Sequence, residues 1–295
     1  MRFSRVTATA IALCLVSPAL LAQKQLALLT LVSSVSGLDV AVSKANIKVT
    51  EDGNRLTVSH LELVPRVPKL QVLIDNGAGF AGGGLADLRT GLKGLLAQLP
   101  PGLEVALVTT APQPRMLEPA TTDRVKLRAA IDRLVPDAGS GRFVEGLFEA
   151  MTPVDKDRDD NADYVIVNVA TSTGELNFRE DDVKKTAEQV RRHHPTIYTI
   201  LLNANNSGSA GGVQTDFGEG LANMTGGHFE SIAISNRLAT LLPELGAALE
   251  RLMGAGTRQL RVTVERASTG PIGQIGMTID GLSVLHMTLD PARTK

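Results

Sequence analysis

The middle of the chain alternates between short apolar runs and amphipathic stretches. Buried strands are predicted at 70–74, 103–110, 164–170 and 196–202, with shorter strands at 115–117 and 228–232. Helical patterns lie between them, at 85–99, 122–134, 139–151, 181–194, 216–224 and 237–253. Near-continuous apolar strands that alternate with helices predict an α/β fold with a mostly parallel central sheet, flanked by helices on both faces.

Both ends of this region have β patterns instead. Strands are expected at 26–32, 38–42, 46–50 and 56–64, and again at 259–264, 275–279 and 282–289. An Asp52-Gly53 turn signal separates two of them and predicts a hairpin. We expect the N- and C-terminal flanking strands to form one small β-rich module, with the C-terminal strands packing on the N-terminal ones.

The first residues have the pattern of a secretory signal peptide. Arg2 and Arg5 precede an apolar run at 6–16 that is short for a membrane span, and small residues follow it. Cleavage is expected after Ala19 or Ala22, and an uncleaved N-terminal anchor is the alternative. The predicted organisation is a signal peptide (1–22), a small β module (23–66), an α/β domain (67–255) and C-terminal strands (256–295).

Composition excludes several classes of function. The one cysteine, Cys14, lies inside the predicted signal, so the mature chain has no disulfide and no thiol nucleophile. Removing Arg2 and Arg5 leaves 30 − 2 = 28 basic against 31 acidic residues, a net charge of −3. The chain has no tryptophan and few other aromatic residues, so it offers few stacking platforms and nucleic acid is not expected as a partner. We expect a secreted or periplasmic protein without a membrane span after cleavage.

The loop after the first sheet strand admits two interpretations. Gly77, Gly79 and Gly82 match the G-x-G-x-x-G pattern that lets a dinucleotide pyrophosphate approach a helix N-terminus. The acidic residue that should end the second strand and hold the ribose is missing, because that strand ends in Thr109 and Thr110. An exported, Rossmann-like dinucleotide-binding oxidoreductase is therefore an alternative function.

The second interpretation is a resemblance to a known family. Asp75 directly follows the first apolar strand, and the order of elements over 69–253 is similar to that of von Willebrand factor A domains. The segment around Glu51-Asp52-Gly53 resembles the hairpin that precedes this domain in a group of exported bacterial, especially acidobacterial, proteins. The resemblance implies a protein-binding domain in which Asp-x-Ser-x-Ser, a Thr and a second Asp hold Mg²⁺. It also implies an antiparallel edge hairpin at 103–117, whereas a Rossmann fold would have two symmetric halves.

The chain departs from that metal-binding pattern in all three loops. Gly77 and Gly79 stand where the two serines belong, and Gly141 stands at the threonine position beside Ser140. In the third loop, Thr171-Ser172-Thr173 has Thr173 in place of the second aspartate. Mg²⁺ prefers six oxygen ligands including one or two carboxylates. With Asp75 as the one carboxylate, we expect no functional metal site and no cofactor, and Asp75 would order the loop. A Mg²⁺-dependent adhesion module with a rebuilt site is the alternative.

Other candidate sites have simpler explanations. The acidic run 155–161 has D-x-D-x-D spacing, but Asp160 and Ile166 stand where a calcium loop needs Gly and Glu, so we expect a solvated loop. His193 and His194 are adjacent at a helix end, and Ser172 lacks a complete G-x-S-x-G elbow. The remaining candidates are His60, His228 and His286, in predicted strands without an acidic partner, and Lys184, Lys185, Arg191 and Arg192, on a charged helix.

These observations predict a binding or scaffolding protein and not an enzyme. A protein partner would contact the loops at the carboxyl end of the sheet, over residues 75–84, 140–142, 171–175 and 204–212. The candidate binding residues are Asp75, Asn76, Gly77, Gly79, Ser140, Gly141, Thr171, Ser172 and Thr173.

Overall fold

The computed structural model describes residues 25–34, 40–80, 82–156, 162–173, 180–203, 208–254, 256–267 and 270–290. These residues form two compact units. The first combines residues from both ends of the chain, up to Arg66 and from Gly254 onward, and the second covers Val67–Met253. The predicted signal peptide, Cys14 and most of the acidic run 155–161 lie outside the described residues.

The first unit is a closed antiparallel barrel with the strand order β1-β10-β3-β2-β11-β12. Its strands are β1 (Gln25–Ser34), β2 (Ile47–Glu51), β3 (Asn54–Val64), β10 (Thr257–Glu265), β11 (Ile275–Ile279) and β12 (Leu282–Leu289). N-terminal β1 pairs with C-terminal β10 and β12, which confirms the predicted module of flanking strands. One expectation was wrong: residues 40–42 of the predicted strand 38–42 are not in a strand, and 35–39 lie outside the described residues.

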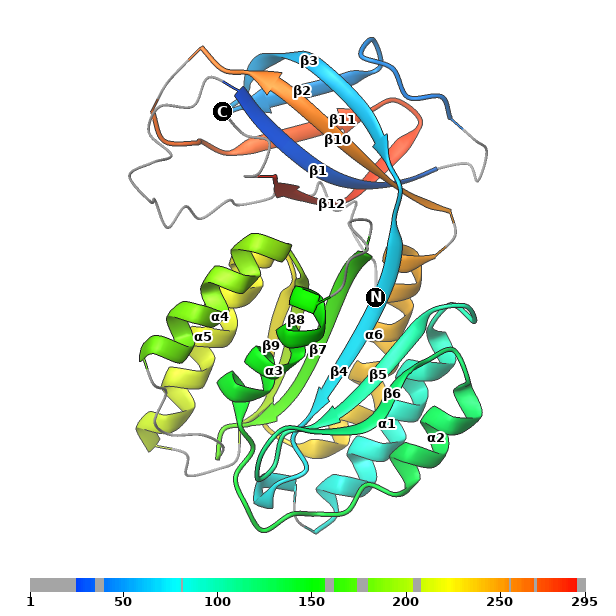
Figure 1. The fold of residues 1–295 in the computed structure, drawn as a ribbon, viewed down its shortest axis with the longest axis vertical. Helices are drawn as coiled ribbons and strands as arrows, with labels where there is room; N and C mark the ends of the chain where they lie inside the picture. The colour runs from blue at the N-terminus through cyan, green and yellow to red at the C-terminus, as the bar shows by residue number, and fades with distance from the viewer. Residues whose placement is uncertain are drawn as a thin grey trace. The chain divides into compact units, whose positions relative to one another are not determined.

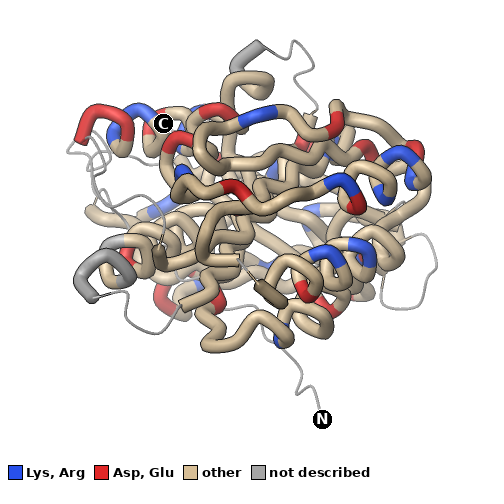
Figure 2. Tube along the Cα trace, turned by 90° about the horizontal axis from the view of Figure 1, so that it is seen from below, with Lys and Arg blue, Asp and Glu red and all other residues tan. Residues whose placement is uncertain are grey.

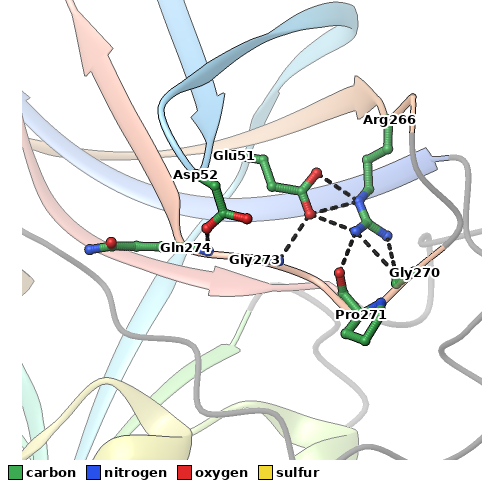
Figure 3. A network of polar contacts seen from close by, with 7 residues as sticks. All are labelled: Glu51, Asp52, Arg266, Gly270, Pro271, Gly273 and Gln274. Atoms are coloured by element: carbon green, nitrogen blue, oxygen red, sulfur yellow. Dashed lines mark hydrogen bonds and ion pairs between the residues drawn. The ribbon is translucent and has the colours of Figure 1, made fainter.

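Glu51 and Asp52, at the turn between β2 and β3, bond to the segment that connects β10 to β11. Arg266 has no exposed side-chain surface, and its guanidinium donates to Glu51 through Nε–Oε2 at 2.9 Å and Nη2–Oε1 at 2.5 Å. The same guanidinium donates to the Pro271 carbonyl at 2.8 Å, and Glu51 accepts from the Gly273 amide at 2.9 Å (Figure 3). Charge-assisted pairs with several donors are the strong kind, so this network holds the end of β2 firmly against the segment between β10 and β11.

Asp52 extends the network on the same turn. Its backbone adopts a φ of 49°, next to Gly53 at 81°, as a tight hairpin turn requires. Its carboxylate accepts from the Gln274 amide at 2.8 Å, and its own amide donates to the Gln274 carbonyl at 2.9 Å (Figure 3). The Glu-Asp-Gly sequence is therefore a structural clamp between two turns of the barrel.

The second unit is an α/β domain with the sheet order β6-β5-β4-β7-β8-β9. Its strands are β4 (Val67–Ile74), β5 (Glu104–Thr109), β6 (Arg115–Thr121), β7 (Ala162–Thr171), β8 (Thr196–Leu202) and β9 (His228–Ile232). All neighbours are parallel except β5 and β6, which form the antiparallel edge hairpin expected for a von Willebrand A arrangement. The predicted fold class is therefore confirmed.

Helices cover both faces of this sheet (Figure 1). One face packs on α3 (Phe143–Lys156), α4 (Glu180–His193) and α5 (Gly208–Thr225), through a core that includes Leu147, Ile166 and Leu201. Figure 1 shows α1 (Gly84–Gln98), α2 (Arg124–Asp132) and α6 (Leu238–Met253) on the opposite side. Two short 3-10 turns, η2 (Ala78–Phe80) and η3 (Ser235–Arg237), precede α1 and α6.

Helix α5 begins earlier than its sequence indicates. Residues 204–212 were expected to form a Gly/Asn/Ser loop with a helix from 216, but α5 already starts at Gly208, and 204–207 lie outside the described residues. Each glycine in a helix costs about 1 kcal/mol relative to alanine. The buried positions Gln214, Gly218 and Leu221 show that the later part of α5 packs against the domain, and such packing outweighs that cost.

Candidate functional site

The carboxyl ends of β4, β5 and β7 bring three predicted binding segments together. The Asp75 amide donates to the Val169 carbonyl of β7 at 2.9 Å, which places Asp75 beside the end of that strand. Thr110, after β5, donates to Ile74 at 3.0 Å and accepts from the Arg142 amide at 3.0 Å. Parallel strands end at the same edge of a sheet, so these backbone bonds gather the loops there.

The Asp75 carboxylate is enclosed by protein donors. Asp75 is only 2% exposed. Its Oδ1 accepts from the Gly77 amide at 2.7 Å, and its Oδ2 accepts from the Thr171 amide at 3.1 Å and the Thr171 hydroxyl at 2.7 Å. The Thr171 and Thr173 hydroxyls lie 3.1 Å apart. Three donors from two loops thus hold one carboxylate.

Burial raises the pKa of the Asp75 carboxyl above its ordinary value, because the charged form is desolvated. The hydrogen bonds from Thr171 and Gly77 act in the opposite direction, since they favour the ionised form, but the desolvation is larger. The carboxylate therefore lies in a closed, low-dielectric position that water barely reaches.

Three glycines allow this close packing. A Cβ atom at Gly141 would overlap the Asp75 carboxyl group, with 2.5 Å to Oδ1. A Cβ at Gly79 would lie 2.5 Å from the Thr171 hydroxyl, and one at Gly77 would lie 2.5 Å from the Gly139 carbonyl. The glycines at the expected Ser and Thr positions are therefore required by the packing of the loops on one another.

The packing around Asp75 also affects the two alternative ligands, Mg²⁺ and a dinucleotide. A metal site needs free oxygens that face one point, whereas the Asp75 oxygens already accept three protein hydrogen bonds. Across the described residues, no group of three or more His, Cys, Asp or Glu side chains could hold a metal ion. For a dinucleotide, the space beside Gly77 and Gly79 is filled by Gly139 and Thr171.

Asn76 and the segment after α2 complete the loop cluster. The Asn76 side-chain amide donates to the Val135 carbonyl at 3.0 Å, and its backbone carbonyl accepts from Asp137 at 2.8 Å. Asp137 in turn accepts from the Gly139 amide at 2.9 Å. Sequence reasoning missed the part before Ser140, although Pro136-Asp137-Ala138-Gly139 is a turn signal that could have indicated it.

The other candidates are spread over the domain. Ser140 is exposed, whereas Ser172 is fully buried and its amide donates to Leu202 at 2.9 Å. His193 ends α4, and His194 follows with a positive φ of 51°. The third segment, 171–175, is described only as far as Thr173.

Exposed apolar side chains lie at the same end of the sheet. Val135 is 64% exposed next to Asn76, and Ile234, which follows β9, is 60% exposed. The next residue after Ile234, Ser235, donates to Asp87 in the first turn of α1 at 2.6 Å, close to the end of the 75–84 loop. These two apolar side chains carry no signal in sequence periodicity, because they lie in irregular segments.

In the part of the chain that the structure describes, no helix has both the length and the apolar character needed to cross a membrane.

No protein-family model matches the chain, and no curated protein matches it in sequence. Solved structures do match. A von Willebrand factor type A protein from Catenulispora acidiphila is similar with a TM-score of 0.51 at 12% identity, over 90% of this chain and 73% of that one. Proximal thread matrix protein 1 from the mussel byssus is similar with a TM-score of 0.50 at 12% identity, over 70% of this chain and 51% of its own. The likeness shows a von Willebrand factor A fold.

Proposed function

We propose, starting from the von Willebrand factor A fold, that this chain is an exported protein-binding or scaffolding module that works without a metal ion and without catalysis. Its contacts come from the loops at the carboxyl end of the sheet. The observation that carries the proposal is the closed Asp75 position, where three protein donors occupy the carboxylate that a bridging cation would need.

The surface around Asp75 supports direct protein contact. We call the following exposed, uncharged residues around Asp75 the loop face: Ala78, Gly82, Gly83, Val135, Pro136, Ala138, Ser140, Thr173 and Ile234. Arg142 of the same loops is charged and exposed, and its Nε lies 3.9 Å from Glu145 Oε2. Exposed apolar side chains such as Val135 and Ile234 are typical of the central part of protein interfaces. In Figure 1 strands β4 and β7 point downward, and Figure 2, the view from below, shows Lys/Arg and Asp/Glu positions interspersed along the trace.

Localisation enters the proposal through the sequence. The pattern of residues 1–22 predicts export to the periplasm or the cell exterior, which is where the partner would be met. The mussel protein, which shares the fold, is by name a matrix protein of the byssus thread. We propose a structural, non-catalytic role for this chain, as the name of the mussel protein indicates for that protein.

A pair of matched valine variants tests the loop face. Val135→Asp places a charge on it, and Val125→Asp places the same charge at the N-terminus of α2, where the valine is 77% exposed. The mature chain, each variant and an EDTA-treated sample would each be used to capture partners from the native cell envelope. We expect wild type and Val125→Asp to capture the same proteins with and without EDTA, and Val135→Asp to lose them.

Three outcomes would contradict the proposal. Capture that disappears with EDTA would favour a metal-dependent adhesion module, as would a rise in melting temperature with Mg²⁺ or Mn²⁺ that Asp75→Ala abolishes. Equal capture by Val135→Asp would place the contact elsewhere on the molecule.

A further inference from the structure

The two edges of the α/β sheet differ in how they are protected. Strand β6 carries Pro119 and has two register shifts against β5, both of which hinder the addition of another strand. Strand β9 is regular from its pairing of Tyr198 with His228 to that of Leu202 with Ile232, and it contains no proline, glycine or lysine. Among the described strands, β9 has β8 as its one neighbour.

The backbone of β9 shows which groups face outward. The Ile232 carbonyl accepts from the Asn203 amide at 2.8 Å, so the peptide groups of Ile232 point toward β8. Backbone direction alternates along a parallel strand, so Glu230 and His228 also bond toward β8. Phe229 and Ser231 therefore present their N–H and C=O groups to the open edge.

The side chains of β9 are divided between the two faces of the sheet. Phe229 packs toward α5, where a Cβ at Gly218 would lie 2.8 Å from its ring. His228 and Glu230 point to the other face, with His228 Nε2 lying 3.8 Å from Glu230 Oε2. The side chains of His228 and Glu230 are 68% and 34% exposed, so both reach solvent beside the open edge. The neighbouring Arg237 on that face is already paired with Glu244 at 3.0 Å.

We propose that β9 is the interface of a symmetric dimer, in which β9 of a second copy pairs antiparallel with it about a two-fold axis at Phe229. This inference goes beyond the proposed function and does not depend on it. Hydrogen-bonded antiparallel pairs can form only between outward-facing residues, which leaves registers that place Phe229 opposite Phe229, Phe229 opposite Ser231, or Ser231 opposite Ser231.

Charge selects among these registers. Phe229 opposite Ser231 would place Glu230 directly opposite Glu230, and like charges in that position are destabilising. Ser231 opposite Ser231 would place Glu230 against the buried, apolar Ile232. Phe229 opposite Phe229 places each His228 opposite the other copy's Glu230. One His–Glu pair then lies on each side of the two-fold axis. The pairing also covers the outward backbone groups of β9.

Analytical ultracentrifugation of the mature chain, with both units present, over a range of concentrations tests this proposal. We expect wild type to approach twice its monomer mass, while His228→Glu, which faces acid with acid, and Ser231→Pro, which removes an outward N–H, each raise the dissociation constant at least tenfold. Arg115→Glu, on the opposite edge of the sheet, is the matched control and should leave the dimer unchanged. Circular dichroism should show that each variant keeps the wild-type fold.

A mixing experiment isolates the register. His228→Glu and Glu230→Lys should each dimerise weakly alone, but an equimolar mixture should form a heterodimer. In that heterodimer the introduced glutamate of one copy faces the introduced lysine of the other, and the native Glu230 of the first faces the native His228 of the second. A monomeric wild type at every concentration would overturn the proposal. A dimer that survives His228→Glu and Ser231→Pro would also overturn it, as would a mixture that stays monomeric.

Discussion

At the scale of single residues, Gly141 and Gly79 leave the loop cluster no room for the hydroxyls that a metal-binding relative would carry there. Adding those oxygens should therefore destabilise the domain instead of creating a site. We expect Gly141→Thr and Gly79→Ser each to lower the free energy of unfolding by about 1–3 kcal/mol, the usual cost of overpacking. Urea denaturation would measure this. Gly83→Ser is the control, since no atom lies within 4 Å of a Cβ at Gly83.

The buried carboxyl of Asp75 gives a second prediction at this scale. Because its folded-state pKa is raised above 3.8, its contribution to stability is full below that pH and is lost as the pH rises through the folded-state pKa. The free energy of unfolding of wild type, minus that of Asp75→Asn, should therefore fall with rising pH above 3.8. Denaturation series at several pH values would show it, and a flat or rising difference would contradict it.

The sequence indicated the residues of this cluster but not its closed state. Asp75, Gly77, Gly141 and Thr171 could be placed at one edge of a sheet because each follows or precedes a predicted strand or helix. The Gly77 bond is a local pattern, since an aspartate often accepts from the backbone amide two residues on. The two Thr171 bonds join residues 96 positions apart, which no local pattern encodes. The exposed Val135 could not be predicted as a contact residue for the same reason.

At the scale of elements, the start of α2 shows how one side chain fixes a helix terminus. Thr122 and Asp123 are both residue types that cap helices, and the structure selects Asp123, which accepts from the Val125 amide at 2.9 Å and the Lys126 amide at 3.2 Å. Asp123→Ala should lower the free energy of unfolding by about 0.5–2 kcal/mol. Thermal denaturation would test this, and Asp123→Asn should recover most of the loss.

Helices α1 and α6 pack closely because glycines lie at their contact. A Cβ at Gly91 would overlap the Leu238 carbonyl, and one at Gly246 would lie 2.8 Å from the Leu95 carbonyl. Gly91→Ala should therefore lower the melting temperature, although alanine is the better helix former. An unchanged or higher melting temperature would show that the two helices can separate without cost.

Elements with strong periodicity were predictable, and those that depend on distant contacts were not. The strands 164–170 and 196–202 are apolar throughout most of their length, and the structure has them as β7 and β8. The first turns of α5 are rich in glycine and serine, which favour a loop locally. Their helical state follows from packing further along α5, which short-range patterns do not report.

At the scale of the whole molecule, the two units can be followed separately. Both tyrosines of the chain, Tyr164 and Tyr198, lie in the α/β unit, so tyrosine signals report that unit. Hydrogen exchange of barrel peptides reports the other. Separate signals for the two units make it possible to test Glu51, which lies in the barrel. Its pKa is lowered chiefly by the hydrogen bond from Arg266, and the Gly273 amide adds to this effect.

A lowered carboxyl pKa means that ionisation of the carboxyl stabilises the folded state. The Glu51 contribution is present above its ordinary pKa of 4.5 and is lost as the pH falls through the folded-state pKa. Glu51→Gln should therefore destabilise the barrel at neutral pH and weaken its acid dependence, as measured by hydrogen exchange of β2, β3 and β10 peptides. The tyrosine signal serves as the control and should change little.

The barrel takes strands from both ends of the chain, so two separate peptide crossings connect it to the α/β unit, at residues 65–66 and 254–256. A cut at the first crossing divides the chain into two pieces, but the second crossing still joins the α/β unit covalently to β10 and the strands that follow it. A cut at the first crossing also leaves β3 hydrogen-bonded to β10 over Thr57–Val64. A single nick should thus be silent on a sizing column and visible only after denaturation, because the hydrogen-bonded barrel strands hold the two pieces together.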